Sequence, residues 1–194
     1  MEKRKQRKLI IMQSLAAMLE ERDLLKITTA ELAKRSEITE AAIYKHFPSK
    51  RKIYEELVIF FEESIFTRLV AMREETKPED FPGQLISLVL KFCETNKGFS
   101  RILTREVFTA DEIKIIDKVC NCFEKINIEI RQSLQDYERT TKKKLNLNLA
   151  LSCDLLLSCL EGQIQSFVRS KFKKDLSSSW QDQWSFLKKA IFPS

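Results

Sequence analysis

Glycine and proline are scarce in this chain, which contains 3 glycines and 4 prolines among 194 residues. Many short strands, or a phosphate-binding glycine loop, would need more of these turn-forming residues. Hydrophobic residues make up 43% of the chain and charged residues 32%, which is typical of a folded protein rather than a disordered one. The sequence therefore predicts an all-α fold.

Breaks in the hydrophobic periodicity divide the chain into about nine helices. We predict them at residues 3–23, 28–35, 39–45, 50–75, 84–95, 99–108, 111–139, 146–172 and 179–191. Loops are expected at 77–83, which contains Pro78 and Pro82, and at 96–98, 140–144 and 175–178. Two domains are predicted, a head at residues 1–50 and a helical body at residues 51–194.

Positive charge is concentrated near the N-terminus. Residues 1–55 contain 13 basic and 8 acidic side chains, whereas residues 56–194 contain 21 and 20. A local basic excess on helices suits a polyanion, either nucleic acid or an anionic membrane surface. The longest apolar run, Leu57 to Phe61, is far shorter than the ~18 residues that span a bilayer. We therefore expect a cytoplasmic chain with no membrane partner.

Two short helices joined by a turn are predicted between residues 28 and 45. Thr28, followed three residues later by Glu31, forms a capping box in which the threonine hydroxyl accepts from the Glu31 amide. Thr39 caps the second helix after a turn at residues 36–38. This arrangement is a helix-turn-helix, whose second helix enters the major groove of DNA. The motif favours double-stranded DNA over a membrane.

The residues that would contact DNA follow from this arrangement. Side chains at the start of the second helix would meet base edges, and the others would meet phosphates. Glu40 is assigned to a cytosine amino group, and Tyr44 and Lys50 are assigned to phosphates. A core position is the better interpretation of Phe47. The candidate DNA-binding residues are Thr28, Thr29, Thr39, Glu40, Ala41, Tyr44, Lys45, His46 and Lys50.

The last two predicted helices carry an apolar stripe that is too wide for one helical partner. We therefore predict a homodimer, which would read a palindromic DNA site because one helix-turn-helix reads only a half-site. Gly162 would allow close approach of two backbones at the two-fold axis. The stripe comprises Leu155, Leu156, Leu157, Leu160, Ile164, Phe167, Val168, Trp180, Trp184, Leu187 and Ile191.

No pattern typical of catalysis or metal binding is visible in the sequence. The 5 cysteines are irregularly spaced, with no Cys-x-x-Cys pair, and His46 is the only histidine. There is also no nucleophile elbow. We predict no enzymatic activity, no catalytic residues, no metal and no cofactor, and we interpret the cysteines as buried small hydrophobic residues.

At the helix-turn-helix the sequence resembles the TetR family of regulators. The resemblance rests on Ile27–Ala33, Ile38–Phe47 and Pro48–Lys50. It implies a three-helix DNA-binding head and a C-terminal helical dimerisation body. Glu37 stands where the family usually has glycine. Either the turn is strained, since a non-glycine residue at positive φ costs about 1 to 3 kcal/mol, or its geometry differs.

The body resembles one branch of this family, the nucleoid occlusion factors. That resemblance rests on residues 99–104, 123–126, 130–132, 159–162 and 167–172. It implies a nucleoid-associated, DNA-bound dimer that captures the C-terminal tail of the division protein FtsZ and blocks ring assembly over the chromosome. The implied tail-binding residues are Phe60, Arg68, Leu88, Lys91, Thr95 and Asn96.

Two alternatives stay open at this point. The resemblance places the tail-binding groove between the fourth and fifth predicted helices. Lys91 stands where the branch has glycine and Thr95 where it has arginine. The floor of the groove would therefore be bulkier, and one positive charge would lie at residue 91 instead of residue 95. Phe60 and Leu88 are equally well interpreted as core positions. The alternative function is a ligand-responsive TetR-type repressor, whose body would enclose a cavity with a few convergent polar groups.

Overall fold

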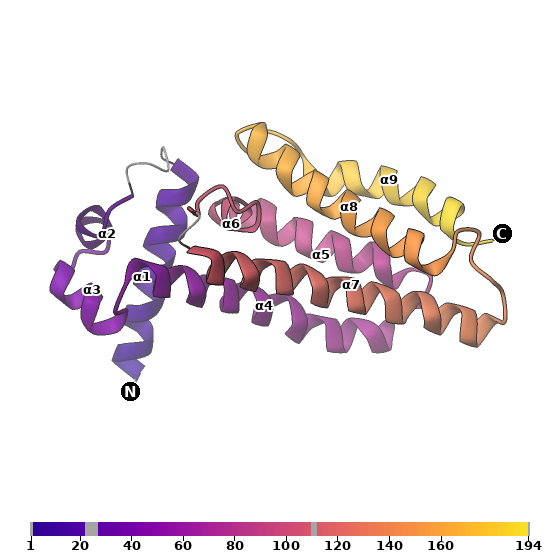
Figure 1. Cartoon of the computed structure of the whole chain (residues 1–194), viewed down its shortest axis with the longest axis horizontal. Helices are drawn as coiled ribbons and strands as arrows, with labels where there is room; N and C mark the ends of the chain where they lie inside the picture. The colour runs from indigo at the N-terminus through magenta and orange to yellow at the C-terminus, as the bar shows by residue number, and fades with distance from the viewer. Residues whose placement is uncertain (1, 22–26, 110–111, 194) are drawn as a thin grey trace. The chain divides into compact units, whose positions relative to one another are not determined.

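The computed structural model describes residues 2–21, 27–109 and 112–193, and the regular elements in these ranges are nine α-helices (Figure 1). The prediction of an all-α fold is confirmed for this part of the chain. The helices are α1 (Glu2–Glu21), α2 (Thr29–Arg35), α3 (Glu40–His46), α4 (Lys50–Glu75), α5 (Phe81–Thr95), α6 (Lys97–Leu103), α7 (Ile113–Thr141), α8 (Leu149–Arg169) and α9 (Leu176–Ile191).

The helices form two compact units, each built from segments that are distant in the sequence. Unit 1 comprises Met1–Phe61 and Asn96–Val119, and unit 2 comprises Glu62–Thr95 and Cys120–Ser194. In unit 1, α1, α2 and α3 pack on one another and α6 packs on α1. In unit 2, α5 packs against α8 and α9. The predicted division at residue 50 stays a prediction.

The core of unit 1 follows the apolar periodicity of α1. Ile11 and Leu15 are fully buried, one helical turn apart. Phe47 is also fully buried, as the sequence predicts, and the Lys8 ammonium lies 5.1 Å from its ring centroid. A Cβ at Gly98 would overlap the carbonyl oxygen of Ala16, so only glycine lets α6 approach α1 this closely.

Unit 2 is organised around two tryptophans of α9. The Trp180 indole N–H donates to the Gly83 carbonyl of α5 at 2.9 Å, and its ring stacks on Trp184 with centroids 6.0 Å apart. The Glu94 carboxylate accepts from the backbone N–H groups of Leu176 and Ser177, at 2.7 and 3.0 Å. The last turn of α5 therefore supplies acceptors for the first N–H groups of α9.

Several predicted helix ends are wrong, among them the start of α8, which is Leu149 instead of residue 146. The loop predicted at residues 77–83 is too long, because α5 begins at Phe81 with Pro82 in its first turn, where the missing N–H costs nothing. The break predicted at 175–178 lies instead at residues 170–175, because α8 ends at Arg169 instead of residue 172 and α9 begins at Leu176. Asp175 caps α9, and its carboxylate accepts from the Ser178 amide at 2.9 Å. Helix α6 ends at Leu103 instead of residue 108. The predicted boundaries at residues 23 and 111 lie outside the described residues.

Most of the apolar stripe predicted for dimerisation is already covered within one chain. The buried members of the stripe therefore do not need a second copy of the protein to cover them. Phe186 is 73% exposed and Leu151 is 50% exposed, and they are the large apolar side chains that these two helices leave to solvent. The buried members are Leu156, Leu160, Ile164, Phe167, Val168, Trp180 and Ile191.

The described residues contain neither a helix suited to crossing a membrane nor a cluster of metal-binding side chains. No helix there has both the length and the apolar character needed to cross a membrane. No group of three or more His, Cys, Asp or Glu side chains is arranged to hold a metal ion in those same residues. Of the cysteines, Cys93, Cys122 and Cys153 are buried, whereas Cys120 and Cys159 are only partly buried.

Candidate nucleic-acid interface

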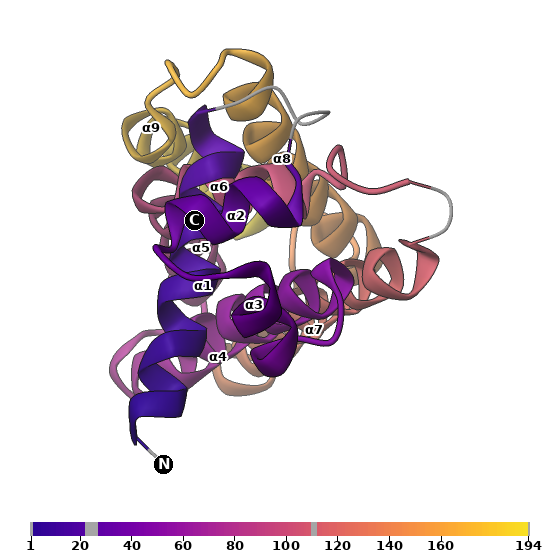
Figure 2. The ribbon, with the colours of Figure 1, turned by 90° about the vertical axis from the view of Figure 1, so that its left-hand side faces the viewer.

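Both predicted helix caps form in unit 1. Thr28 Oγ1 accepts from the Glu31 amide at 3.2 Å, and Thr39 Oγ1 accepts from the Ala42 amide at 3.2 Å. These hydrogen bonds fix where α2 and α3 begin. Figure 2 shows α2 and α3 facing the viewer, with α1 running alongside them. The structure therefore contains the predicted helix-turn-helix.

The turn between α2 and α3 has the geometry of a Schellman motif. The Ile38 amide donates to the Ala33 carbonyl at 3.1 Å, and the Glu37 amide donates to the Lys34 carbonyl at 3.3 Å. Glu37 has a φ of 54°, in the left-handed region that favours glycine. Of the two alternatives raised by the sequence, the strained turn is therefore the one observed.

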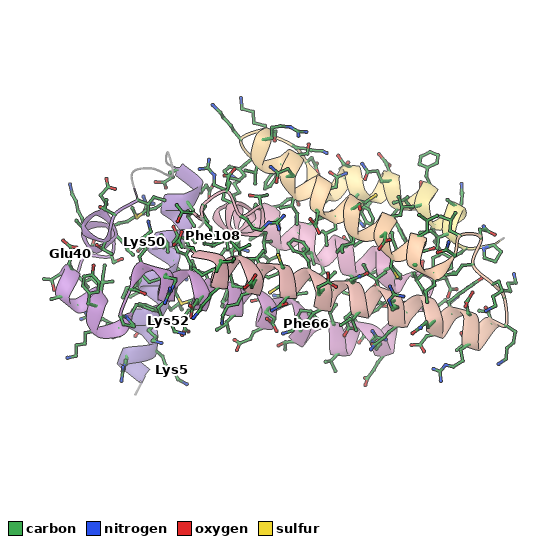
Figure 3. All side chains as sticks on the ribbon, in the orientation of Figure 1. Lys5, Glu40, Lys50, Lys52, Phe66 and Phe108 are labelled. Carbon is green, nitrogen blue, oxygen red and sulfur yellow. The ribbon has the colours of Figure 1, made fainter. Side chains whose placement is uncertain are left out.

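The exposed face of α3 carries the residues assigned to base edges. Glu40, Ala41 and Lys45 are exposed, and Tyr44 is 49% exposed. Figure 3 shows Glu40 at the outer side of unit 1, where α3 begins. This face has the exposure that major-groove reading requires.

Three of these candidates are joined by hydrogen bonds that the sequence does not predict. Thr29 Oγ1 donates to Glu40 Oε2 at 3.0 Å and lies 3.4 Å from the Tyr44 hydroxyl. The network links the first residue of α2 to two positions on α3. It therefore places Thr29 beside the base-reading face instead of leaving it isolated at a helix end.

Basic side chains of α1 surround the end of α3. The pKa of His46 lies below its ordinary value, mainly because burial disfavours its charged form, and then because of the cations of Arg4, Arg7, Lys45 and Lys8. Of this group, only His46 and Lys45 are among the DNA-binding residues predicted from the sequence. The other three belong to the basic run that opens the chain, and their position beside α3 depends on how α1 crosses α3.

Lys50 points toward the protein in this structure. Its ammonium donates to the Ile27 carbonyl at 2.8 Å and lies 5.7 Å from the ring centroid of Tyr54. Partial burial lowers its pKa, against the opposing effect of Glu112. Lys50 thus holds the segment that leads into the α2 cap, and its assignment to a DNA phosphate stays a prediction.

The six candidate tail-binding residues are divided between the two units. In unit 1, Phe60 is 38% exposed and its ring centroid lies 5.9 Å from that of Phe99. Asn96 is half-buried at the N-cap of α6. The ring of Phe60 is therefore partly accessible and not a fully buried core side chain.

The other four candidates lie in unit 2. Arg68 is exposed on α4, and Leu88 is half-buried on α5. The Lys91 ammonium lies 3.6 Å from the Glu94 carboxylate, and the Thr95 hydroxyl donates to the Lys91 carbonyl at 2.9 Å. Lys91 and Thr95 are both exposed. Their role in binding a partner stays a prediction.

Two protein families match this chain. Residues 11–57 match the bacterial regulatory proteins of the tetR family, and residues 83–191 match the SlmA-like group of the tetracyclin repressor-like C-terminal domain. The chain belongs to the TetR family. Membership makes it a DNA-binding regulator of the SlmA-like type, as the sequence predicts, and not an enzyme.

Curated relatives match along nearly the whole chain. The nucleoid occlusion factor SlmA of Shewanella halifaxensis is 37% identical over 185 residues, covering 95% of this chain and 94% of the relative. The nucleoid occlusion factor SlmA of a Marinomonas species is 34% identical over 186 residues, with the same two coverages. The similarity therefore includes the body as well as the helix-turn-helix.

Solved structures support the fold at lower sequence identity. The transcriptional regulator FadR of Bacillus subtilis, in complex with stearoyl-CoA, has a TM-score of 0.75 at 15% identity, covering 94% of this chain and 98% of its own. PfmR of Thermus thermophilus, a TetR-family regulator, has a TM-score of 0.73 at 17% identity, covering 92% and 97%. These likenesses confirm the predicted TetR-like fold.

Proposed function

We propose that this protein is a nucleoid occlusion factor, which binds DNA as a homodimer and captures the C-terminal tail of FtsZ. The observation that carries the proposal is the 37% identity to a nucleoid occlusion factor over 95% of the chain. Captured FtsZ would be prevented from assembling a division ring over the chromosome, so the protein would act at the nucleoid.

DNA recognition is assigned to the helix-turn-helix of unit 1. Glu40 accepts from a base amino group, Lys45 and Tyr44 lie along the same exposed face, and the basic residues around His46 meet the phosphates. Thr28, Thr39 and Ala41 lie at the helix starts, where backbone N–H groups approach the duplex. Two such units read a palindrome with half-site centres about 34 Å apart, or a multiple of that distance.

Dimerisation is assigned to the exposed faces of α8 and α9. Phe186 and Leu151 supply apolar surface, and a Cβ at Gly162 would meet no atom within 4 Å in the single chain. Gly162→Arg should therefore fold normally yet separate the subunits, as measured by circular dichroism and analytical ultracentrifugation. A variant that remains dimeric would move the interface elsewhere.

Tail capture is assigned to the six residues found by resemblance. Arg68 offers an exposed cation for a tail carboxylate, while Phe60 and Leu88 offer partly exposed apolar surface. Lys91 and Thr95 lie on the last turns of α5, and Asn96 follows them. Truncating a buried interface anchor commonly costs more than ~1 kcal/mol, so single substitutions here should be measurable.

The test titrates a fluorescent peptide of the FtsZ C-terminal tail, from the same organism, with the dimer bound to its selected DNA site. Arg68→Asp should abolish peptide binding and preserve DNA binding. Arg139→Asp is the matched control, because Arg139 has a side chain 75% exposed and lies outside the candidate set. Absence of binding by the unmodified protein would refute tail capture.

One hollow in unit 2 bears on the ligand-responsive alternative. A hollow of about 280 Å³ lies between α5 and α9, lined by Asp80, Gly83, Gln84, Ser87, Trp180, Gln181 and Trp184. Ligand pockets usually measure about 300 to 1,000 Å³, so this hollow lies just below that range. Failure of tail capture would favour this second function.

A further inference from the structure

The hydrogen bonds among Thr29, Glu40 and Tyr44 have a defined direction. A threonine hydroxyl carries one proton, and Thr29 gives that proton to Glu40 Oε2 at 3.0 Å. The 3.4 Å contact between Thr29 Oγ1 and the Tyr44 hydroxyl must then have Tyr44 as the donor. This series of hydrogen bonds runs from Tyr44 through Thr29 to the Glu40 carboxylate, and all three residues belong to unit 1.

This arrangement leaves one oxygen of Glu40 for another partner. A carboxylate has two oxygens with about four lone-pair positions, and Thr29 uses one position on Oε2. Oε1 remains to accept from an amino group in the major groove, such as cytosine N4. Glu40 is exposed, so without Thr29 its side chain would lose more rotamer freedom on binding.

We propose that Thr29 is a positioning residue that sets base specificity by holding the Glu40 carboxylate in its reading orientation. This role differs from the phosphate contact assigned to Thr29 from the sequence. It rests on the proposed reading of a base by Glu40. Tyr44 is the first donor in this series of hydrogen bonds, so losing its hydroxyl leaves the bond between Thr29 and Glu40 in place.

The experiment compares Thr29→Val, which removes the hydroxyl at nearly constant shape, with Thr29→Ser, which retains it. Binding is measured on the selected DNA site and on sites changed at the base pair that Glu40→Ala identifies. A good base contact supplies about 5- to 150-fold discrimination. Thr29→Val should lose part of this factor at that base pair, whereas Thr29→Ser should keep it, and Tyr44→Phe should keep it too because the bond between Thr29 and Glu40 remains.

The double variant of Thr29→Val with Glu40→Ala separates positioning from a direct contact. If Thr29 acts through Glu40, the double variant matches Glu40→Ala alone. Additive losses, or equal weakening of every site by Thr29→Val, would show that Thr29 contacts phosphate and would overturn the proposal. If Glu40→Ala changes no base preference, the underlying base-reading assignment is wrong as well, and the positioning role with it.

Discussion

The Lys50 ammonium is hydrogen-bonded to the carbonyl oxygen of Ile27, the residue that precedes the α2 cap, at a distance of 2.8 Å. A lysine at the start of α4 thereby fixes the entry to the helix-turn-helix. Figure 3 shows Lys50 lying inward among the helices of unit 1, whereas Glu40 lies at its outer side. The two residues were both assigned to DNA from the sequence, yet they differ in what they contact in the protein.

Replacing Lys50 by methionine should destabilise unit 1, because the Ile27 carbonyl loses a charged donor in a partly buried position. Hydrogen bonds to charged groups contribute about 1.5 to 3 kcal/mol, and partial solvent access places the expected loss at the lower end. Urea unfolding measures it. If Lys50 also contacts phosphate, the negative slope of log K for DNA against log salt will become shallower by about 0.9 in the variant. An unchanged slope would confine Lys50 to its structural role.

Replacing Glu37 by glycine should stabilise the protein. Glu37 has a φ of 54°, and glycine adopts this conformation without the steric cost of a Cβ. The expected gain is about 1 kcal/mol, the lower end of the range for such strain, because glycine also makes the unfolded chain more flexible. Thermal unfolding provides the measurement, and Glu37→Ala, which keeps the Cβ, is the control. Equal effects of the two variants would refute the strain argument.

Local signals along the chain predicted much of the fold and part of the site. The hydroxyls of Thr28 and Thr39 cap the helices as their spacing predicts, and Phe47 is buried. Such features depend on residues three or four positions apart, so the sequence specifies them. Pro82 misled the prediction because proline both breaks helices and occupies their first turn.

Contacts between distant residues were not predictable in the same way. The bond between Thr29 and Glu40 spans 11 residues and depends on how α2 crosses α3. The approach of Gly98 to Ala16 joins segments about eighty positions apart, and no periodicity reports it. The candidate partner-binding residues were reached only by resemblance, since an exposed arginine such as Arg68 has no local pattern that marks a binding role.

Replacing Gly98 by alanine should destabilise unit 1. The added Cβ would overlap the Ala16 carbonyl oxygen, a backbone atom that cannot rotate away. Overpacking costs about 1 to 3 kcal/mol, which exceeds the ~1 kcal/mol that alanine gains over glycine in a helix. Unfolding followed by circular dichroism should show a lower midpoint. A rise in the midpoint would mean that α6 moves away from α1 at no cost.

The stability of the free protein should fall as the pH is lowered through about 6.5, the ordinary pKa of histidine. The folded-state pKa of His46 lies below that value, so the unfolded chain binds the proton first and protonation favours unfolding. His46→Gln should remove this part of the pH dependence in urea titrations between pH 5.5 and 8. Identical pH profiles for the two proteins would contradict the prediction.

Binding to DNA should raise the pKa of His46 from its value in the free protein. Phosphates placed near Arg4, Arg7, Lys8 and Lys45 would offset the cations that disfavour protonation of His46. Binding would then take up a proton, and affinity should rise as the pH falls from 7.5 to 6. His46→Gln is again the comparison, measured by fluorescence anisotropy at constant salt. An affinity that is independent of pH in the unmodified protein would place His46 away from the phosphates.

The departures at residues 91 and 95 should set the preference for one FtsZ tail over another. The Lys91 ammonium lies 3.6 Å from the Glu94 carboxylate, and the Thr95 hydroxyl donates to the Lys91 carbonyl. The positive charge is therefore at residue 91 and next to a carboxylate, whereas an arginine would place it at residue 95. The double replacement Lys91→Gly and Thr95→Arg should shift binding toward the tail of a Shewanella FtsZ and away from the tail of the same organism. Titrating both peptides against both proteins measures the shift.

Since glycine costs about 1 kcal/mol within a helix, unfolding is followed in parallel, with Lys91→Gly alone as the control. An unchanged ratio of the two affinities, in a folded double variant, would exclude residues 91 and 95 from tail recognition.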